Sequence, residues 1–305
     1  MCKWMTFEDI NEQAAVLGGY DQTYRQTGAG QYSGAFASGS YGDGVSLHIE
    51  TANRSLLQEG SVPSSSLGIG FMPEPSGACT LNGINLGQHN LVLLPPKASF
   101  DARFSGSTSF MLISISLDTL SEYAEKALMP NRVWQTTAQG AANTLQSLKG
   151  WAKRSRASTQ PLPSRDLIDD LIASLSWDSD LNAPLRLNAC DQFKIYNRAR
   201  DWIKSNLQHK ISIAAMSRDI GACRRSIEYS VKSMTGESPQ RYIRLMRLNE
   251  IRHALLHVGV EDGTITSLAY QWGISHLGRF SQEYAALFGE LPSVTLSRRQ
   301  LNLPN

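Results

Sequence analysis

The sequence is poor in cysteine, and its few cysteines lie far apart. Cys2, Cys79, Cys190 and Cys223 form no CxxC pair, which argues against a zinc knuckle and against a disulfide framework. No apolar run approaches the roughly 18 residues that a membrane-spanning helix needs. Residues 1–19 also lack the basic and then apolar pattern of a signal peptide. A reducing cytoplasm is therefore the expected location.

The chain has a net charge of only +2, but its two parts differ in sign. Residues 194–305 hold 16 Lys and Arg against 9 Asp and Glu, whereas residues 1–193 hold 13 against 18. The balance is thus +7 in the C-terminal part and −5 in the rest. A basic module attached to an acidic remainder indicates a polyanion-binding part, although a solvated surface can carry the same bias.

The N-terminal part is rich in Gly, Ser and short apolar stretches. Asn82-Gly83 stands between Leu81 and Ile84 and is a strong signal for a β-hairpin. Many short strands with regular turns predict a small cupin-like barrel or sandwich. Four segments are expected to be strands, namely 44–50, 67–71, 90–94 and 109–115.

The apolar period changes to that of helices after residue 116. Segments 117–128, 138–153 and 164–177 have a helical pattern. These helices could pack on the β-rich part or pair with a second subunit. The polar stretch 178–187, which contains Pro184, is expected to be a linker.

The C-terminal part contains an internal repeat, which is the strongest pattern in the sequence. Ser212 begins a helix that ends at Gly221, and Thr264 begins one that ends at Gly273, 52 residues further on. Ser and Thr favour the N-cap of a helix, and Gly favours the position just past its end. A tight turn follows each glycine, and then a second helix.

Helix, glycine turn and second helix make up a helix-turn-helix unit. The second helices are expected at 224–235 and 276–288, each with an apolar inner face. A helix from Pro239 to His257 joins the units, and its 19 residues span about 28 Å at a rise of 1.5 Å per residue. Major grooves on one face of DNA repeat about every 34 Å. The second helices could therefore enter neighbouring grooves.

These patterns predict an α+β chain of two domains. Residues 1–180 would form a β-rich sensor or dimerisation domain with a helical extension, and residues 181–192 a linker. Residues 193–305 would form an all-α domain of two helix-turn-helix units joined by a long helix.

Four motifs resemble the signature of the AraC/XylS family of transcription regulators. They are GACRRSI at 221–227, TGESPQRYI at 235–243, WGISHLGRF at 272–280 and LFGELPS at 287–293. The resemblance covers residues 194–299. It implies sequence-specific binding of double-stranded DNA by the C-terminal domain, and a small-molecule effector or a homodimer contact for the N-terminal domain. An activator would also contact RNA polymerase.

The base contacts below are carried over from the family's contact positions. Arg224 and Lys232 are expected to contact phosphates, with plain surface charges as the alternative. Base contacts are expected from Arg225, Glu228, His276, Leu277, Gly278, Arg279 and Gln282, because such side chains and close backbone approach suit base edges.

The first unit departs from the family pattern. Cys223 stands where the family usually has Ser, and a thiol caps a helix poorly. Val231 replaces Phe and Tyr229 replaces a basic residue, so this unit is expected either to bind DNA less strongly or to read it differently. Within the family, residues 271–280 and 292–296 look most like the ethanolamine-operon regulator.

Two other functions compete with DNA binding. The first is an N-terminal cupin-like metal enzyme with a helical accessory domain, since His48 and Glu50 could share one face of a strand. His89 is the other histidine in this half, no HxH pair occurs, and we expect neither a bound metal nor another cofactor. The second is an adaptor that binds only proteins and has an incidental basic face.

Overall fold

The computed structural model describes residues 3–40, 44–72, 77–86, 91–121, 134–135, 146, 149–150, 187–257 and 265–302. The chain divides into two compact units. The β-rich unit comprises Met1–Tyr24, Ser33–Asn53 and Gln58–Leu185. The helical unit comprises Arg25–Tyr32, Arg54–Leu57 and Arg186–Asn305. Within the described part of the chain, no helix is both long enough and apolar enough to cross a bilayer.

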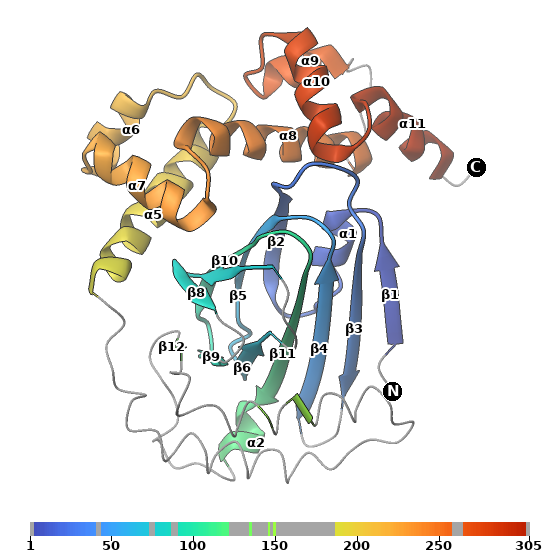
Figure 1. Ribbon diagram of the computed structural model, residues 1–305, viewed down its shortest axis with the longest axis vertical. Coiled ribbons are helices and arrows are strands. Elements are labelled where there is room, and N and C mark those ends of the chain that lie inside the picture. Colours follow the sequence, from blue (N-terminus) through green and yellow to red (C-terminus); the bar gives the residue numbers. More distant parts are fainter. Residues whose placement is uncertain are drawn as a thin grey trace. The chain divides into compact units, whose positions relative to one another are not determined.

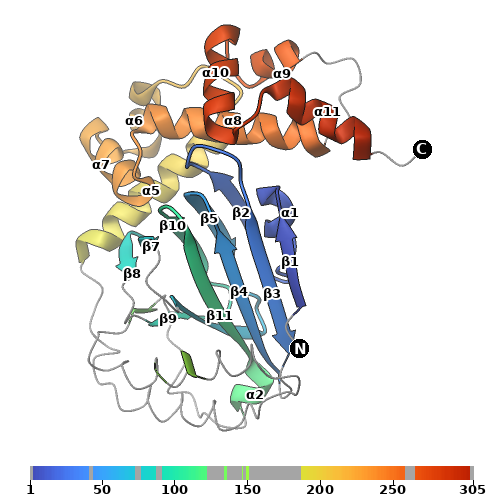
Figure 2. The ribbon, with the colours of Figure 1, turned by 45° about the vertical axis from the view of Figure 1, so that its right-hand side comes forward.

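The β-strands form two antiparallel sheets (Figures 1 and 2). The larger sheet has the order β1 (Lys3–Phe7), β3 (Gly34–Ser40), β4 (Val45–Ala52), β11 (Thr108–Ser116), β6 (Ser66–Phe71), β9 (Leu91–Leu94) and β12 (Trp134–Gln135). The smaller has the order β2 (Asp21–Gln26), β5 (Leu56–Ser61), β10 (Ser99–Phe104), β7 (Cys79–Leu81) and β8 (Ile84–Leu86). The four predicted strands correspond to β4, β6, β9 and β11, so the predicted β-rich N-terminal domain is confirmed.

The hairpin between β7 and β8 forms where the sequence predicts it. Asn82 and Gly83 both have positive φ, at 48° and 80°, which a two-residue type I′ turn requires. Leu81 pairs directly with Ile84 across the turn.

Strands β4 and β11 in the middle of the larger sheet are fully buried on one face and partly buried on the other. Leu47 of β4 pairs with Ile113 of β11, and both are fully buried. Because side chains alternate along a strand, His48 and Glu50 lie on the opposite face from Leu47. On that face His48 pairs with Leu112 and Glu50 pairs with Phe110. Two polar residues are thereby brought among apolar ones.

The described residues of the helical unit form seven helices, which are labelled in Figure 1. They are α5 (Leu187–Ser205), α6 (Ile213–Ile220), α7 (Arg224–Thr235), α8 (Pro239–His257), α9 (Ile265–Gln271), α10 (Leu277–Phe288) and α11 (Pro292–Asn302). Helix α8 begins as predicted, because the Ser238 hydroxyl accepts from the Arg241 N–H at 3.3 Å and Pro239 suits the first position.

Helix α8 contributes to two separate apolar cores. Its residues Tyr242, Ile243 and Met246 pack with α5, α6 and α7. Its residues Leu248, Ile251 and Leu255 pack with α9 and α10. Each helix-turn-helix unit therefore has its own core on a helix that both units share.

The segment before the helical unit is described only in part. Helix α2 (Leu117–Ser121) is the first part of the helix predicted at 117–128. The helices predicted at 138–153 and 164–177 lie outside the described residues, apart from 146 and 149–150, which are helical. Of the predicted linker 181–192, residues 187–192 are the first turns of α5, and residues 181–186 lie outside the described part.

Candidate nucleic-acid interface

The first helix-turn-helix unit is bounded by specific capping contacts. The Ser212 hydroxyl accepts from the Ala215 N–H at 3.4 Å and caps α6. Gly221 ends α6 with φ +62°, and its N–H donates to the Arg218 carbonyl. A left-handed backbone costs other residues about 1 kcal/mol or more, so glycine suits this turn.

The second unit repeats this arrangement. Gly273 follows α9 with φ +68°, and the Ile274 N–H donates to the Ala269 carbonyl at 2.9 Å. Helix α10 then begins after His276 and ends at Gly289, which has φ +75°. The predicted cap Thr264 lies outside the described residues. Two copies of one turn geometry therefore precede α7 and α10.

Helix α7 starts without a side-chain cap, as expected for Cys223. The thiol makes no side-chain capping hydrogen bond at the start of α7. Instead its sulfur lies 3.1 Å from the Ser226 hydroxyl, and this contact is the main cause that lowers the pKa of Cys223. The first turn of α7 is thus less firmly held than that of α6.

Helix α7 presents a polar, mostly exposed face. Arg224, Arg225 and Lys232 are exposed. The half-buried Glu228 accepts from Arg224 Nε at 2.8 Å, which pairs a predicted phosphate contact with a predicted base contact. Tyr229 is 61% exposed, and the sequence reasoning gave this aromatic ring no contact role.

Helix α10 presents the corresponding face in the second unit. Arg279 is exposed and donates from Nε to Glu283 Oε1 at 2.8 Å. Glu283 also accepts from Arg244 of α8. Leu277 is half-buried and packs on the second core, so only part of its side chain is open to contact. His276, Gly278 and Gln282 are exposed.

The two candidate recognition helices lie toward opposite ends of α8 (Figure 1). α7 packs with α5 and the start of α8, whereas α10 packs with the later part of α8. The predicted arrangement of two helix-turn-helix units joined by one long helix is therefore confirmed.

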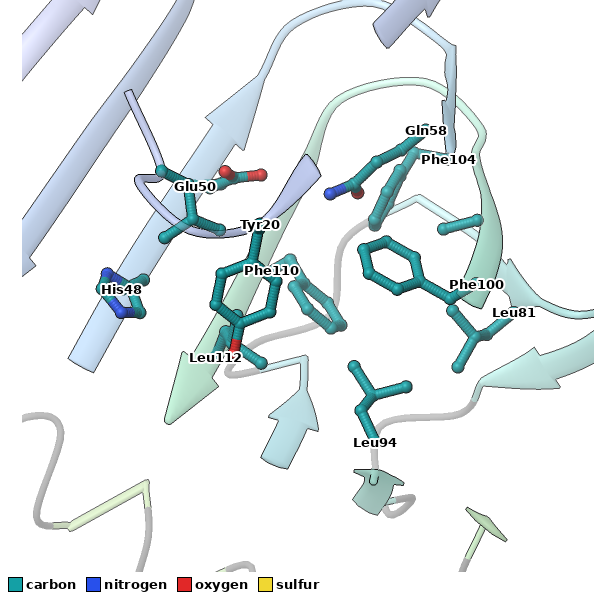
Figure 3. A pocket seen from close by; sticks show the side chains of 12 residues that line it. Tyr20, His48, Glu50, Gln58, Leu81, Leu94, Phe100, Phe104, Phe110 and Leu112 are labelled. Atoms are coloured by element: carbon teal, nitrogen blue, oxygen red, sulfur yellow. The ribbon is translucent and has the colours of Figure 1, made fainter. Parts of the chain in front are cut away.

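The β-rich unit contains a separate candidate site, an apolar pocket with a buried carboxyl group. Tyr24 Oη donates to Glu50 Oε2 at 2.5 Å, and Gln58 Nε2 donates to Tyr24 Oη at 3.2 Å. Figure 3 shows the Glu50 and Gln58 head groups on one side of the pocket. The other lining residues are Leu17, Tyr20, His48, Leu81, Leu94, Phe100, Ala102, Phe104, Phe110 and Leu112.

Burial changes the acid-base behaviour of two pocket residues. Loss of hydration raises the pKa of Glu50 to about 7, and the Tyr24 hydroxyl offsets part of this effect. Burial lowers the pKa of His48 to about 4, so its ring is neutral at pH 7. Glu50 Oε1 is buried and has no hydrogen-bond partner among the described residues. The cavity volume is about 20 Å³, which is enough for about one water molecule.

The pocket does not gather a set of metal ligands. In the described ranges, no three His, Cys, Asp or Glu side chains are close enough to hold one ion. His48 instead bonds through Nδ1 to the Ser38 hydroxyl at 2.9 Å. His89 lies outside the described residues. The metal-enzyme alternative therefore gains no support from this geometry.

Comparison with known proteins links the chain to transcription regulators. A helix-turn-helix domain family matches residues 216–298. The XylDLEGF operon transcriptional activator 2 of Pseudomonas putida is 33% identical over 106 residues, which are 35% of this chain and 68% of that protein. The probable thc operon regulatory protein of Rhodococcus erythropolis is 26% identical over 167 residues, or 54% of this chain. The chain spans about half, 48%, of that regulator's length.

A solved structure was also similar in part. A probable AraC family transcriptional regulator from Rhodopseudomonas palustris is 29% identical with a TM-score of 0.33, covering 35% of this chain and 97% of that one. The two curated relatives named above are both regulators of operons. The paired helix-turn-helix units, the family match and the similarity to the Pseudomonas activator together show that the chain belongs to the AraC/XylS family of transcription regulators.

Proposed function

We propose that the chain is a sequence-specific DNA-binding transcription activator, with α7 and α10 as its recognition helices. The observation that carries the proposal is the pair of glycine-turn units toward opposite ends of α8. A rod of about 28 Å suits successive major grooves about 34 Å apart. Promoter DNA as the partner also favours a cytoplasmic location.

We assign the contacts by helix. In α7, Arg225 and Glu228 read bases, while Arg224 and Lys232 contact phosphates. In α10 the base contacts are His276, Leu277, Gly278, Arg279 and Gln282. Their exposure supports this assignment, although Glu228 and Leu277 are only half-exposed. The positive net charge of residues 194–305 also supports DNA binding, since phosphate contacts provide most of the non-specific affinity for DNA.

DNase footprinting on the DNA upstream of the gene tests this function. One protected site is expected, and its affinity should fall steeply with salt because Lys and Arg displace counterions. An adaptor that binds only proteins would protect no site. Stoichiometric iron, manganese or zinc in the purified protein would instead favour the enzyme alternative.

Arg279→Ala is expected to weaken binding at the preferred site by about 1–3 kcal/mol and to relax the preference at one base position. The reason is that a base contact carries sequence information, whereas a phosphate contact does not. Binding to a library of single-base variants of the site measures both effects.

Lys232→Ala is the matched control for a phosphate contact. It should weaken binding almost equally on all sequences and make the salt dependence less steep. If Arg279→Ala also weakened all sequences equally, Arg279 would be a phosphate contact and its assignment would be wrong.

The effector of the proposed activator would bind in the pocket around Glu50 and Gln58. A ligand with a hydrogen-bond donor would satisfy the buried Glu50 Oε1. The small cavity limits the ligand to a compact one unless side chains move. A homodimer contact and RNA polymerase are the further partners that we propose.

A thermal-shift screen of small metabolites and amines tests the effector site. Ethanolamine belongs in the screen as a compact candidate, because residues 271–280 and 292–296 resemble the ethanolamine-operon regulator. A cobalamin is included for the same reason, but it is too large for this pocket and would indicate a site elsewhere. Glu50→Gln should abolish the shift caused by a pocket ligand, whereas Glu12→Gln at an exposed position should preserve it. A shift that survives Glu50→Gln would locate the ligand elsewhere.

A further inference from the structure

One arginine in the middle of α8 connects the two helix-turn-helix units. Arg247 Nε donates to the Leu207 carbonyl at 2.9 Å, and Nη2 donates to the His209 carbonyl at 2.5 Å. Both carbonyls precede α6 of the first unit. Arg247 Nη1 donates to the Gly273 carbonyl at 3.2 Å, in the turn of the second unit. A single side chain thus holds backbone from both units.

The chemistry of this contact requires an arginine. A guanidinium has five N–H donors in a rigid plane, whereas a lysine ammonium is a single point at the end of a flexible stem. The Leu207 carbonyl follows the end of α5 and the Gly273 carbonyl follows the end of α9, where the helix dipole is negative. Burial is the main cause that lowers the pKa of Arg247, yet an arginine stays charged at neutral pH.

The absence of a side chain at Gly273 serves both the turn and the contact with Arg247. A Cβ atom there would lie 2.9 Å from Arg247 Nη2 and 3.1 Å from its Cζ. Glycine therefore provides both the φ of +68° and the space for the guanidinium. The neighbouring Trp272 is partly buried and packs against both cores.

The junction between the units is otherwise an open groove. A space of about 570 Å³ lies beside Arg247 and Gly273. Its other lining residues are Lys210, Ile211, Gln240, Ile243, Tyr270, Ile274 and Ser275. Beside this open space, α8, Trp272 and Arg247 contact both helix-turn-helix units and hold them together.

We infer that Arg247 is a positioning residue that fixes the orientation of α7 relative to α10, and with it the spacing between the two DNA half-sites. The inference rests on the proposed function, because spacing has meaning only if both helices read DNA. Arg247 would act through the backbone of both units without touching a base. It is thus a determinant of specificity for site geometry rather than for base identity.

The test measures affinity as a function of half-site spacing, using full-length protein and a site selected from random DNA. Each added base pair moves one half-site by about 3.4 Å and rotates it by about 35°. The natural chain should bind one spacing best. Arg247→Met should lose about 10- to 100-fold at that spacing and should respond less to insertions or deletions of one or two base pairs. Its affinity for single half-sites should change less than about threefold.

Two further variants separate positioning from charge and from folding. Arg247→Lys keeps the charge but cannot reach three carbonyls, so its spacing profile should flatten like that of Arg247→Met. Arg241→Met removes an exposed arginine from the same helix and should keep the natural profile. In a double-mutant cycle, Arg247→Met and Gly273→Ala should be less than additive, because both break one contact.

The outcomes distinguish this inference from the proposed function. If the natural chain selects no DNA site, the proposed function fails and the inference fails with it. If it selects a site but tolerates all spacings, only the inference fails. The inference is also overturned if the Arg247 variants keep the natural profile, or if they lose affinity equally on full sites and half-sites.

Discussion

Replacing Arg252 with methionine should cost the helical unit about 3–5 kcal/mol of folding free energy, because it leaves a buried carboxylate without its main partner. Arg252 Nη1 lies 2.6 Å from Glu290 Oε1, and the two side chains are only 8% and 9% exposed. The guanidinium also lies over the Phe288 ring, 4.9 Å from its centre. This contact ties α8 to the segment between α10 and α11.

The neighbouring polar groups depend on the same ion pair. The Thr295 hydroxyl donates to Glu290 Oε1 at 2.8 Å and accepts from Tyr284 Oη at 3.0 Å. Burial raises the pKa of Tyr284 to about 12, so its hydroxyl remains a donor. Loss of Arg252 would therefore disturb a connected network, and such networks are costly when only partly satisfied.

Urea unfolding monitored by circular dichroism would measure the free energy of unfolding of the Arg252→Met variant. Arg298→Met is the matched control, since Arg298 also pairs with Glu290, at 3.2 Å, but is 38% exposed. An exposed pair contributes at most about 1 kcal/mol. Equal losses for the two variants would show that burial of the Arg252 pair is not what makes it important. Arg252→Met with Glu290→Gln should recover part of the lost stability.

Replacing Glu50 with glutamine should stabilise the β-rich unit by about 2–3 kcal/mol at pH 8 and by less than about 1 kcal/mol at pH 5. One pKa unit corresponds to about 1.4 kcal/mol, and the pKa of Glu50 is raised from 4.5 to about 7. The lower end of the range allows for the partial exposure of the residue as a whole, although its carboxyl oxygen Oε1 is buried.

The sign follows from which state holds the proton. Between about pH 4.5 and 7 the unfolded chain ionises Glu50 while the folded chain keeps it protonated, so stability falls as pH rises. His48 acts oppositely. Its pKa is lowered from 6.5 to about 4, so its contribution is present above pH 6.5 and is lost as pH falls toward 4.

Hydrogen exchange of β4 and β11 amides, compared between Glu50→Gln and the natural chain at each pH, isolates Glu50, because the His48 contribution cancels. Glu12→Gln is the control at an exposed position. A stabilisation that does not depend on pH would mean that the Glu50 carboxyl keeps its ordinary pKa in the folded protein.

Local sequence signals were sufficient for the helix-turn-helix units. Ser212, Gly221 and Gly289 each determine a helix end through their own backbone or side-chain chemistry. The residue type at each position is therefore enough to predict where these helices begin or end. The same holds for Asn82-Gly83, whose positive φ angles define a hairpin turn. The sequence predicts that His48 and Glu50 lie on one face of a strand, because side chains alternate along it. Both residues do lie on the same face of β4 and line the pocket.

Contacts between distant segments were not predictable from the sequence. Arg247 lies within the predicted helix from Pro239 to His257, but its three acceptors are carbonyl groups, which any residue has, at positions 207, 209 and 273. The Arg252–Glu290 pair joins residues that are 38 apart. The unpartnered oxygen of Glu50 depends on two sheets facing each other. A periodic pattern carries no signal for any of these.

The placement of α8 in two cores has a consequence for how the helical unit melts. Tyr242 and Met246 of α8 belong to one core, and Leu248 and Ile251 of α8 belong to the other. Unfolding of α8 in either half would therefore expose apolar side chains of the other half. The halves should lose structure in a single cooperative transition, and a destabilising change in one should speed amide exchange in the other. The two helix-turn-helix modules, which we propose to read separate stretches of DNA, would then share one thermal stability.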